Sequence, residues 1–173
     1  MLNVTRDEDG TFRLVGPPGI LRILWTIPGT LRKLIEDPDA NAKATKCLFP
    51  DAFSDPTAQA EHARLLGDDL KVRQLQKVAV FERVITANDA GKGAISIPES
   101  DFDAFLAVLT DLRLVLAVDI GIESDGWEQL YDEDELDDPR IHLLNLLAAM
   151  QQLLLEATGL VDIELNLDDT ESP

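Results

Sequence analysis

Prolines at the starts of apolar, helix-spaced segments constrain this fold more than any other feature of the sequence. Proline is favoured in the first turn of a helix, because the backbone N–H that it lacks would be unpaired there in any case. The four prolines in such places are Pro18, Pro56, Pro98 and Pro139. The apolar spacing behind them predicts helices over residues 18–36, 56–88, 98–120 and 139–158. The sequence therefore predicts a mainly α fold, a helical bundle of four to five helices.

Residues with capping chemistry flank these segments. Asp55 and Asp138 directly precede two of the prolines, and a carboxylate there accepts hydrogen bonds from the first turn. Gly91, Gly121 and Gly159 follow apolar stretches and suit the left-handed residue that ends many helices. We expect the helices to begin and end near these positions.

Two of the segments also carry internal breaks. Pro28-Gly29 predicts a kink or break in the first helix, after which Thr30 is able to cap the second half. Gly67 with Asp68 and Asp69 predicts that the second helix divides into a short and a longer piece.

Three short runs favour β-structure and predict a small β element beside the helices. They are TFRLV at 11–15, AISI at 94–97 and VDIELNL at 161–167.

The length of 173 residues predicts one domain, residues 1–173, with its helical core at 18–158. Residues 122–138 predict an acidic loop, and residues 168–173 a disordered tail. No apolar run approaches the roughly 20 residues that cross a bilayer, and the first residues do not resemble a signal peptide. We expect a cytoplasmic protein without a membrane partner.

The net charge of −18 is concentrated in the last third of the chain. Residues 119–173 contain 16 acidic residues and one basic residue. Because affinity for phosphate groups depends on cations, this distribution argues against non-specific attraction to nucleic acid or an anionic membrane. An alternative explanation of the acidic charge is that it keeps the protein in solution and suppresses self-association.

Arg113 is the most unusual residue of the third helix. On a helical wheel it lies in the middle of an apolar stripe, which predicts that its guanidinium points inward. An inward charge needs a partner, and Asp51, Asp68 and Asp69 are the candidate carboxylates. The favoured interpretation is a buried ion pair that sets the register of the bundle. The alternative is a pocket that binds a small anionic ligand.

The helix predicted over 139–158 is apolar around most of its circumference. His142, Asn145, Gln152 and Glu156 form its one polar strip. Such a helix lies either at the centre of its own bundle, which we favour, or in a homodimer interface.

Cys47 is the only cysteine, which excludes a disulfide within one chain. Lys43 and Lys46 would lower the pKa of its thiol if they approached the sulfur, and the thiol could then act as a redox switch. The alternative interpretation is that Cys47 is a small, half-buried apolar residue without a redox role. The two histidines, His62 and His142, offer a weak case for a catalytic base, so we assign no catalytic residues.

No cofactor or metal site is indicated. One cysteine and two distant histidines match no zinc spacing, and no glycine-rich phosphate loop is present. The segment around Gly67 resembles a helix-turn-helix in outline, but its cations are spread around the helix instead of forming a stripe. We therefore expect no direct nucleic-acid binding.

Four sequence runs carry a resemblance to a known family. They are CLFPDAFSDP, DDLKVRQLQ, LTDLRLVLAVDIGI and DDPRIHLLNLL, within residues 11–158, and LFPDAF and DLRL are the most specific parts. In this order they resemble an actinobacterial family of uncharacterised domains whose gene often lies beside that of the Clp protease adaptor. Members are often labelled transcriptional regulators, and the resemblance implies regulation through protein partners, with a role in oxidative stress. It implies no catalytic residues.

Together these patterns predict a non-enzymatic regulatory or protein-interaction module with a protein partner or a homodimer. Two alternatives remain open. One is a redox-responsive transcriptional regulator that uses Cys47, and the other is a domain that binds a small anionic ligand at Arg113.

Overall fold

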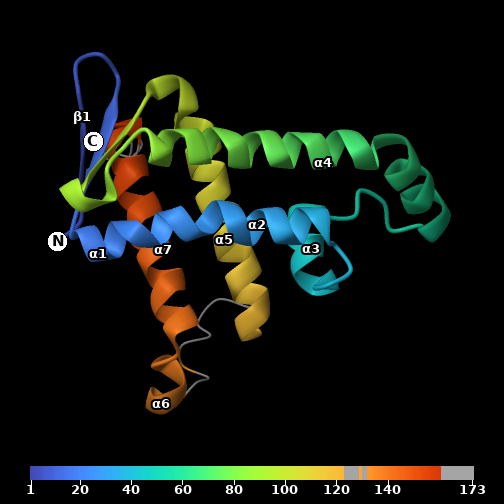
Figure 1. Ribbon diagram of the computed structural model, residues 1–173. Coiled ribbons are helices and arrows are strands. Elements are labelled where there is room, and N and C mark those ends of the chain that lie inside the picture. Colours follow the sequence, from blue (N-terminus) through green and yellow to red (C-terminus); the bar gives the residue numbers. More distant parts are fainter. Residues whose placement is uncertain (123–128, 130–131, 161–173) are drawn as a thin grey trace, which may run out of the picture.

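The computed structural model describes residues 1–122, 129 and 132–160 (Figure 1). The strands are β1 (Asn3–Arg6), β2 (Phe12–Val15) and β3 (Ala94–Ile97). The α-helices are α1 (Pro18–Leu21), α2 (Ile27–Glu36), α3 (Ala42–Leu48), α4 (Pro56–Thr86), α5 (Phe102–Ile120), α6 (Glu133–Leu136) and α7 (Pro139–Ala157). Three 3-10 helices join them: η1 (Arg22–Thr26), η2 (Ala90–Lys92) and η3 (Glu99–Asp101). The predicted fold class, mainly α with a small β element, is confirmed.

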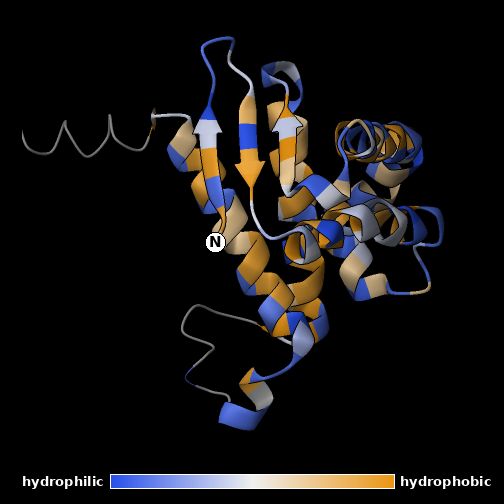
Figure 2. Cartoon of the chain, turned by 60° about the vertical axis from the view of Figure 1, so that its left-hand side comes forward, coloured by the Kyte–Doolittle hydropathy of each residue, from blue (hydrophilic) through white to orange (hydrophobic). Residues whose placement is uncertain are grey.

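The strands form one antiparallel sheet in the order β1-β2-β3, and Figure 2 shows them side by side. Phe12 and Leu14 of β2 are buried while Arg13 and Val15 are exposed, so one face of the sheet lies on the core. The runs at 94–97 and 11–15 supply β3 and, from Phe12 onward, β2, as predicted. The third β-prone run, 161–167, lies outside the described residues.

Helix α5 is the centre of the helical layer. It packs against α3, α4 and α7, while α7 also packs against β1 and β2. Two stacked aromatic pairs tie α5 to its neighbours: the ring centroids of Phe105 and Phe81 lie 4.5 Å apart, and those of Phe102 and Phe12 lie 4.0 Å apart. The central position that we favoured for the helix at 139–158 therefore belongs to α5.

Local capping chemistry sets most of the helix boundaries. The Asp55 carboxylate accepts a hydrogen bond from the Ala58 backbone N–H, and Asp138 caps α7 in the same way. Gly121 ends α5 with a φ of +87°, and Gly159 has a φ of +75° just after α7. These predictions are confirmed. At Pro98 the α-helix begins only at Phe102, because the single turn of η3 comes between them.

Three predicted breaks are in the wrong place. The first helix is interrupted by η1, before Pro28, and this proline lies within the first turn of α2, where it costs no hydrogen bond. α4 is one helix of 31 residues and does not divide at Gly67, where an added Cβ would meet nothing within 4 Å, although its N-terminal part bends away from the rest (Figure 1). Gly91 ends no helix, since α4 ends at Thr86 and the left-handed glycine is Gly93.

Two elements, β1 and α3, lie outside every predicted helix or strand, and α6 lies within a predicted loop. β1 is short and largely exposed, so it lacks the apolar alternation that identifies a strand. α3 has only seven residues, and Asn41 caps it by accepting a hydrogen bond from the Ala44 N–H. The segment predicted as an acidic loop, 122–138, contains the short helix α6, and much of its remainder lies outside the described residues. Within the described part of the chain, no helix is both long and apolar enough to cross a membrane.

Candidate functional site

Arg113 forms part of a polar network between α5 and α7. Its Nη1 donates a hydrogen bond of 2.5 Å to Oε1 of Gln151, the one buried polar residue of the described core. Gln151 Nε2 in turn donates to the Thr110 hydroxyl at 2.6 Å and to the Leu106 carbonyl at 3.2 Å. The network therefore joins the two helices through an amide side chain.

The predicted carboxylate partners of Arg113 do not contact it. Asp51, Asp68 and Asp69 are all exposed, two of them on the first half of α4. Arg113 itself is half-buried, since the buried face of α5 is centred on Phe105, Leu109 and Leu112 and leaves the arginine at its edge. The prediction that Arg113 forms an ion pair with one of these carboxylates is therefore wrong, and its partner is the amide of Gln151.

All described hydrogen-bond partners in this network are groups of α5 and α7 themselves. Gln151 is neutral, so the pairing offers no carboxylate for proton transfer. The Nε of Arg113 is buried without a hydrogen-bond partner in the described structure. The hydrogen bond from Arg113 to the buried Gln151 amide links α5 to α7.

Cys47 lies on α3, where α3 packs against α5. Its Sγ lies 3.8 Å from the carbonyl oxygens of Lys43 and Leu114. Burial raises the pKa of the Cys47 thiol above its ordinary value, and the carboxylate of Asp119 adds to the rise. Lys43 and Lys46 are not among the causes of this shift, since burial and the Asp119 carboxylate determine the pKa of the Cys47 thiol.

A raised thiol pKa predicts slow chemistry at Cys47. Because only the thiolate reacts, we expect the protein to react with an aromatic disulfide reagent more slowly than free glutathione does at pH 7.5. The rate should increase as the pH rises above the ordinary thiol range. Stopped-flow absorbance measures both. A rate above that of glutathione at pH 7.5 would contradict a raised pKa of the Cys47 thiol. It would instead support the hypothesis that Cys47 acts as a redox switch.

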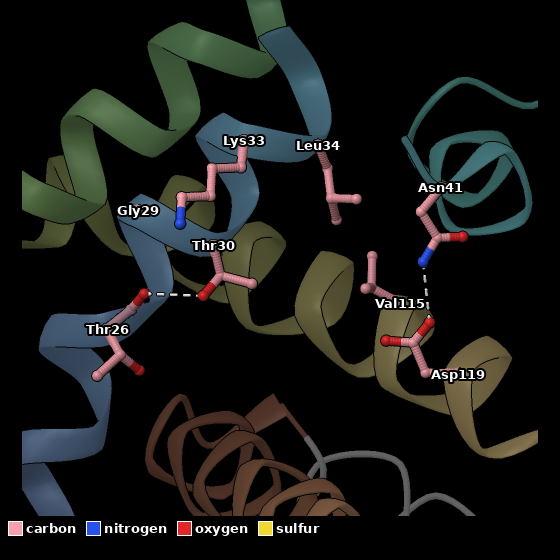
Figure 3. A pocket seen from close by; sticks show the side chains of 8 residues that line it. All are labelled: Thr26, Gly29, Thr30, Lys33, Leu34, Asn41, Val115 and Asp119. Carbon is pink, nitrogen blue, oxygen red and sulfur yellow. Dashed lines mark hydrogen bonds between the residues drawn. The ribbon is translucent and has the colours of Figure 1, made fainter. Parts of the chain in front are cut away.

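A shallow pocket of about 500 Å³ lies beside Cys47, between α2, α3 and α5 (Figure 3). Lys33 lines one side of it and the Asp119 carboxylate another, where it accepts a hydrogen bond of 3.1 Å from Asn41. Thr30 lines it as well, and its hydroxyl donates to the Thr26 carbonyl within the helix. Neither histidine lines this pocket, and the described residues contain no cluster of three metal-ligating side chains.

The first two thirds of α4 contain no buried residue, and their N-terminal part extends beyond the core (Figure 1). No residue of α4 before Val78 is buried, although α4 begins 22 residues earlier. Apolar side chains are nevertheless present on it: Leu65 is 62% exposed and Val72 is 51% exposed. Leu66 and, just before the helix, Phe53 are exposed as well. We call residues 56–77 the α4 arm.

A groove of about 350 Å³ runs along the inner side of this arm. Phe49 and Pro50 of the LFPDAF run line one wall, and His62, Gly67 and Leu70 of the arm line the other. The groove is largely apolar and continues at Phe49 and Leu70 into a smaller depression of about 290 Å³. The LFPDAF run therefore supports the arm, and it also leaves apolar surface accessible beneath it.

Three of the five cations of α4 form ion pairs with carboxylates, while Lys71 and Arg73 form none within the described residues. Arg64 pairs with Glu61 at 2.7 Å, Arg83 with Asp101 at 2.8 Å, and Lys77 with Asp111 at 3.0 Å. Burial raises the pKa of Asp111 above its ordinary value, and the Lys77 ammonium opposes that rise. The absence of direct nucleic-acid binding stays a prediction.

These features describe a mainly helical protein whose accessible apolar surface is gathered on a projecting helix. The chain belongs to the family described as a domain of unknown function (DUF2017), whose model matches residues 5–158. No curated protein and no solved structure is significantly similar to the chain. The family match covers most of the chain, including the whole α4 arm.

The α4 arm is the one surface that the sequence analysis missed. Its signal was weak, because the sequence of 56–77 was compared only with a helix-turn-helix and its exposed apolar residues were not considered as a surface. The spacing of seven residues between Leu65 and Val72 could have been noticed, but only the structure shows that this face points away from the core.

Proposed function

We propose that this protein is a regulatory protein-interaction module that binds an amphipathic helix of a partner on the outer face of the α4 arm. The observation that carries the proposal is the exposure of Leu65 and Val72 on a helix that extends beyond its own core. Exposed apolar side chains that gather on one face of a helix are typical of docking surfaces for other proteins.

The geometry of the arm suits a helical partner. A spacing of seven residues corresponds to about two helical turns, so Leu65 and Val72 lie about 20° apart on a helical wheel, and the buried Val78 lies about 120° to 140° away from them. The 22 residues of the arm make about six helical turns, and the N-terminal part of α4 bends away from the axis of the rest (Figure 1). Two apolar side chains in line would anchor a partner helix.

Charge identifies the chemistry of the partner. Asp68 and Asp69 are exposed between the two anchors, so the partner helix should carry basic residues opposite them. The net charge of −18 favours encounter with a basic surface as well. A second copy of this chain suits the arm less well. In a twofold antiparallel pair centred between Leu65 and Val72, the aspartates of both copies would face one another.

The regulatory part of the proposal rests on the resemblance to a family encoded beside the Clp protease adaptor, whose members are labelled transcriptional regulators. Regulation through a bound protein also fits the ion pairs of Arg64, Lys77 and Arg83, which leave fewer free cations on α4 for direct DNA binding. The raised thiol pKa of Cys47 argues against the redox alternative, and the amide partner of Arg113 argues against the anionic ligand.

We expect Leu65→Glu combined with Val72→Glu to abolish partner capture and leave the fold unchanged. Both side chains are more than half exposed, so the substitutions bury no charge. The measurement is affinity capture of the tagged protein from a lysate of its host, in the presence of nuclease, followed by mass spectrometry. Asp68→Lys with Asp69→Lys should also weaken capture, since it removes the charge complementarity.

The matched control is Leu114→Glu with Leu155→Glu, which places the same charges at exposed leucines of α5 and α7 (45% and 42% exposed). It should retain every protein that the unmodified chain captures. Equal loss in the control, or full capture by the arm variant, contradicts the proposal. A dimer that the arm variant dissociates in sedimentation would assign the surface to a second copy instead.

A further inference from the structure

The groove on the inner side of the α4 arm is formed by three parts of the chain. Its apolar walls come from the end of α2, the LFPDAF run and the arm: Ile35, Pro38, Phe49, Pro50 and Leu70. Its volume of about 350 Å³ lies at the lower end of the range of small-molecule pockets, about 300 to 1,000 Å³. The groove therefore has the size and the lining for a small ligand with an apolar body.

Two polar side chains of the groove lining are already bonded within the fold. Gln59 Oε1 accepts hydrogen bonds from the backbone N–H groups of Ala52 and Phe53, at 2.8 Å and 3.1 Å. The Thr45 hydroxyl donates to the Asn41 carbonyl at 2.9 Å. These hydrogen bonds hold the walls of the groove in place, so the two groups serve its shape and not a ligand.

Lys71 supplies the groove with a cation. It is half-buried in the lining and forms no ion pair within the described residues. Arg73 forms none there either, and it lines the depression of about 290 Å³ into which the groove continues. The exposed Asp51 lies on the opposite wall, in the LFPDAF run. A ligand with an anionic group should therefore place it on the arm side of the groove, at Lys71.

We propose that this groove binds a small apolar carboxylate, whose apolar body lies between Phe49 and Leu70 and whose carboxylate pairs with Lys71. An apolar chain or ring gains buried contacts with the walls, and the carboxylate gains a charge-assisted hydrogen bond from the ammonium group. Arg73 adds positive potential at the same end of the groove. Charge complementarity identifies the head group, because a neutral ligand would leave the half-buried ammonium without an anion.

The ligand would contact the LFPDAF run and the arm at the same time, so its binding should hold the arm against the rest of the fold. The inference does not depend on a partner on the outer face of the arm. Leu70 lies about 140° to 160° from Leu65 and Val72 on a helical wheel, so the groove and the outer face are on different sides of α4. The two surfaces are therefore tested separately.

NMR titration of the full chain with octanoate tests the site, and octan-1-ol serves as the neutral probe of the same chain length. Octanoate should shift the backbone amide signals of the groove lining and should bind more tightly than octan-1-ol. Lys71→Gln should weaken octanoate binding about fivefold and leave octan-1-ol binding unchanged. The matched control is Lys92→Gln, which removes the same charge from an exposed lysine of η2 and should change neither affinity.

Ala63→Glu places a carboxylate in the groove wall and should abolish octanoate binding through charge repulsion. Ala79→Glu is its matched control, an exposed alanine of α4 beyond the arm, and should bind octanoate as the unmodified chain does. Ala63 is exposed as well, so neither substitution buries a charge.

The proposal would be overturned if octanoate shifted no signals of the groove lining, or if the Ala63→Glu variant bound it equally well. Equal affinities for octanoate and octan-1-ol, or no effect of Lys71→Gln, would contradict recognition of a carboxylate. Shifts centred on Leu65 and Val72 would assign octanoate to the outer apolar face instead.

Discussion

Replacing Phe105 with alanine is expected to lower the free energy of unfolding by about 3 to 5 kcal/mol. Phe105 lies on the central helix α5, is fully buried and stacks on Phe81 at 4.5 Å. The substitution removes the ring and leaves a cavity between α4 and α5 that the surrounding close-packed side chains fill only partly. Urea denaturation followed by circular dichroism measures the loss.

Phe53→Ala is the matched control for this substitution. The Phe53 ring is 50% exposed and lies outside the core, so its removal should cost less than about 1 kcal/mol. Equal losses in the two variants would contradict the placement of the core between α4 and α5.

Gln151→Leu is expected to lower the free energy of unfolding by about 2 to 3 kcal/mol. Leucine has a similar volume, so packing changes little, but Arg113 loses its amide acceptor in a half-buried site. The Thr110 hydroxyl and the Leu106 carbonyl lose a donor as well. This loss should exceed that of Arg113→Leu, which removes the charge and also the buried Nε that has no partner in the described structure.

The double variant Arg113→Leu with Gln151→Leu should recover most of the stability. Replacing both partners of a hydrogen bond by apolar side chains leaves neither of them unsatisfied. Denaturation of the four proteins gives a thermodynamic cycle, and we expect a coupling free energy of about 1 kcal/mol or more. Additive losses would show that Arg113 and Gln151 do not act as a pair.

The boundaries of most helices could be predicted from the sequence because capping is local. Asp55, Asp138 and Gly121 interact with backbone groups only a few residues away, so their neighbours along the chain determine what they do. Pro28 and Gly67 were misjudged for a related reason. Pro28 lies in the first turn of α2, where a missing N–H costs no hydrogen bond, and Gly67 lies where α4 has open space around it. A residue that is able to break a helix does not break it at such positions.

The contacts of Arg113 and Cys47 could not be predicted, because they depend on which helix lies opposite. A helical wheel gives the direction of a side chain but not its neighbour, and Gln151 is separated from Arg113 by 38 residues. Cys47 illustrates the same limit. Its neighbours in sequence are lysines, whereas its neighbours in space are backbone carbonyls and the Asp119 carboxylate.

The exposure of the α4 arm could not be predicted either, because it also depends on which elements pack against it. Its apolar residues suit a buried helix, and only the arrangement of α2, α3 and α5 shows that the outer face of residues 56–77 is left uncovered. The proposed interaction surface is therefore the face of the α4 arm on which no other element of the fold packs.

The most direct test of the proposed interaction is photo-crosslinking in the living host, with a benzophenone amino acid in place of Leu65. A second strain should carry it in place of Leu155, on α7, as the control. We predict a covalent adduct with another protein from position 65 and none from position 155, and Asp68→Lys with Asp69→Lys should reduce the adduct. Absence of an adduct at position 65, or the same adducts from both positions, would contradict a partner on the α4 arm.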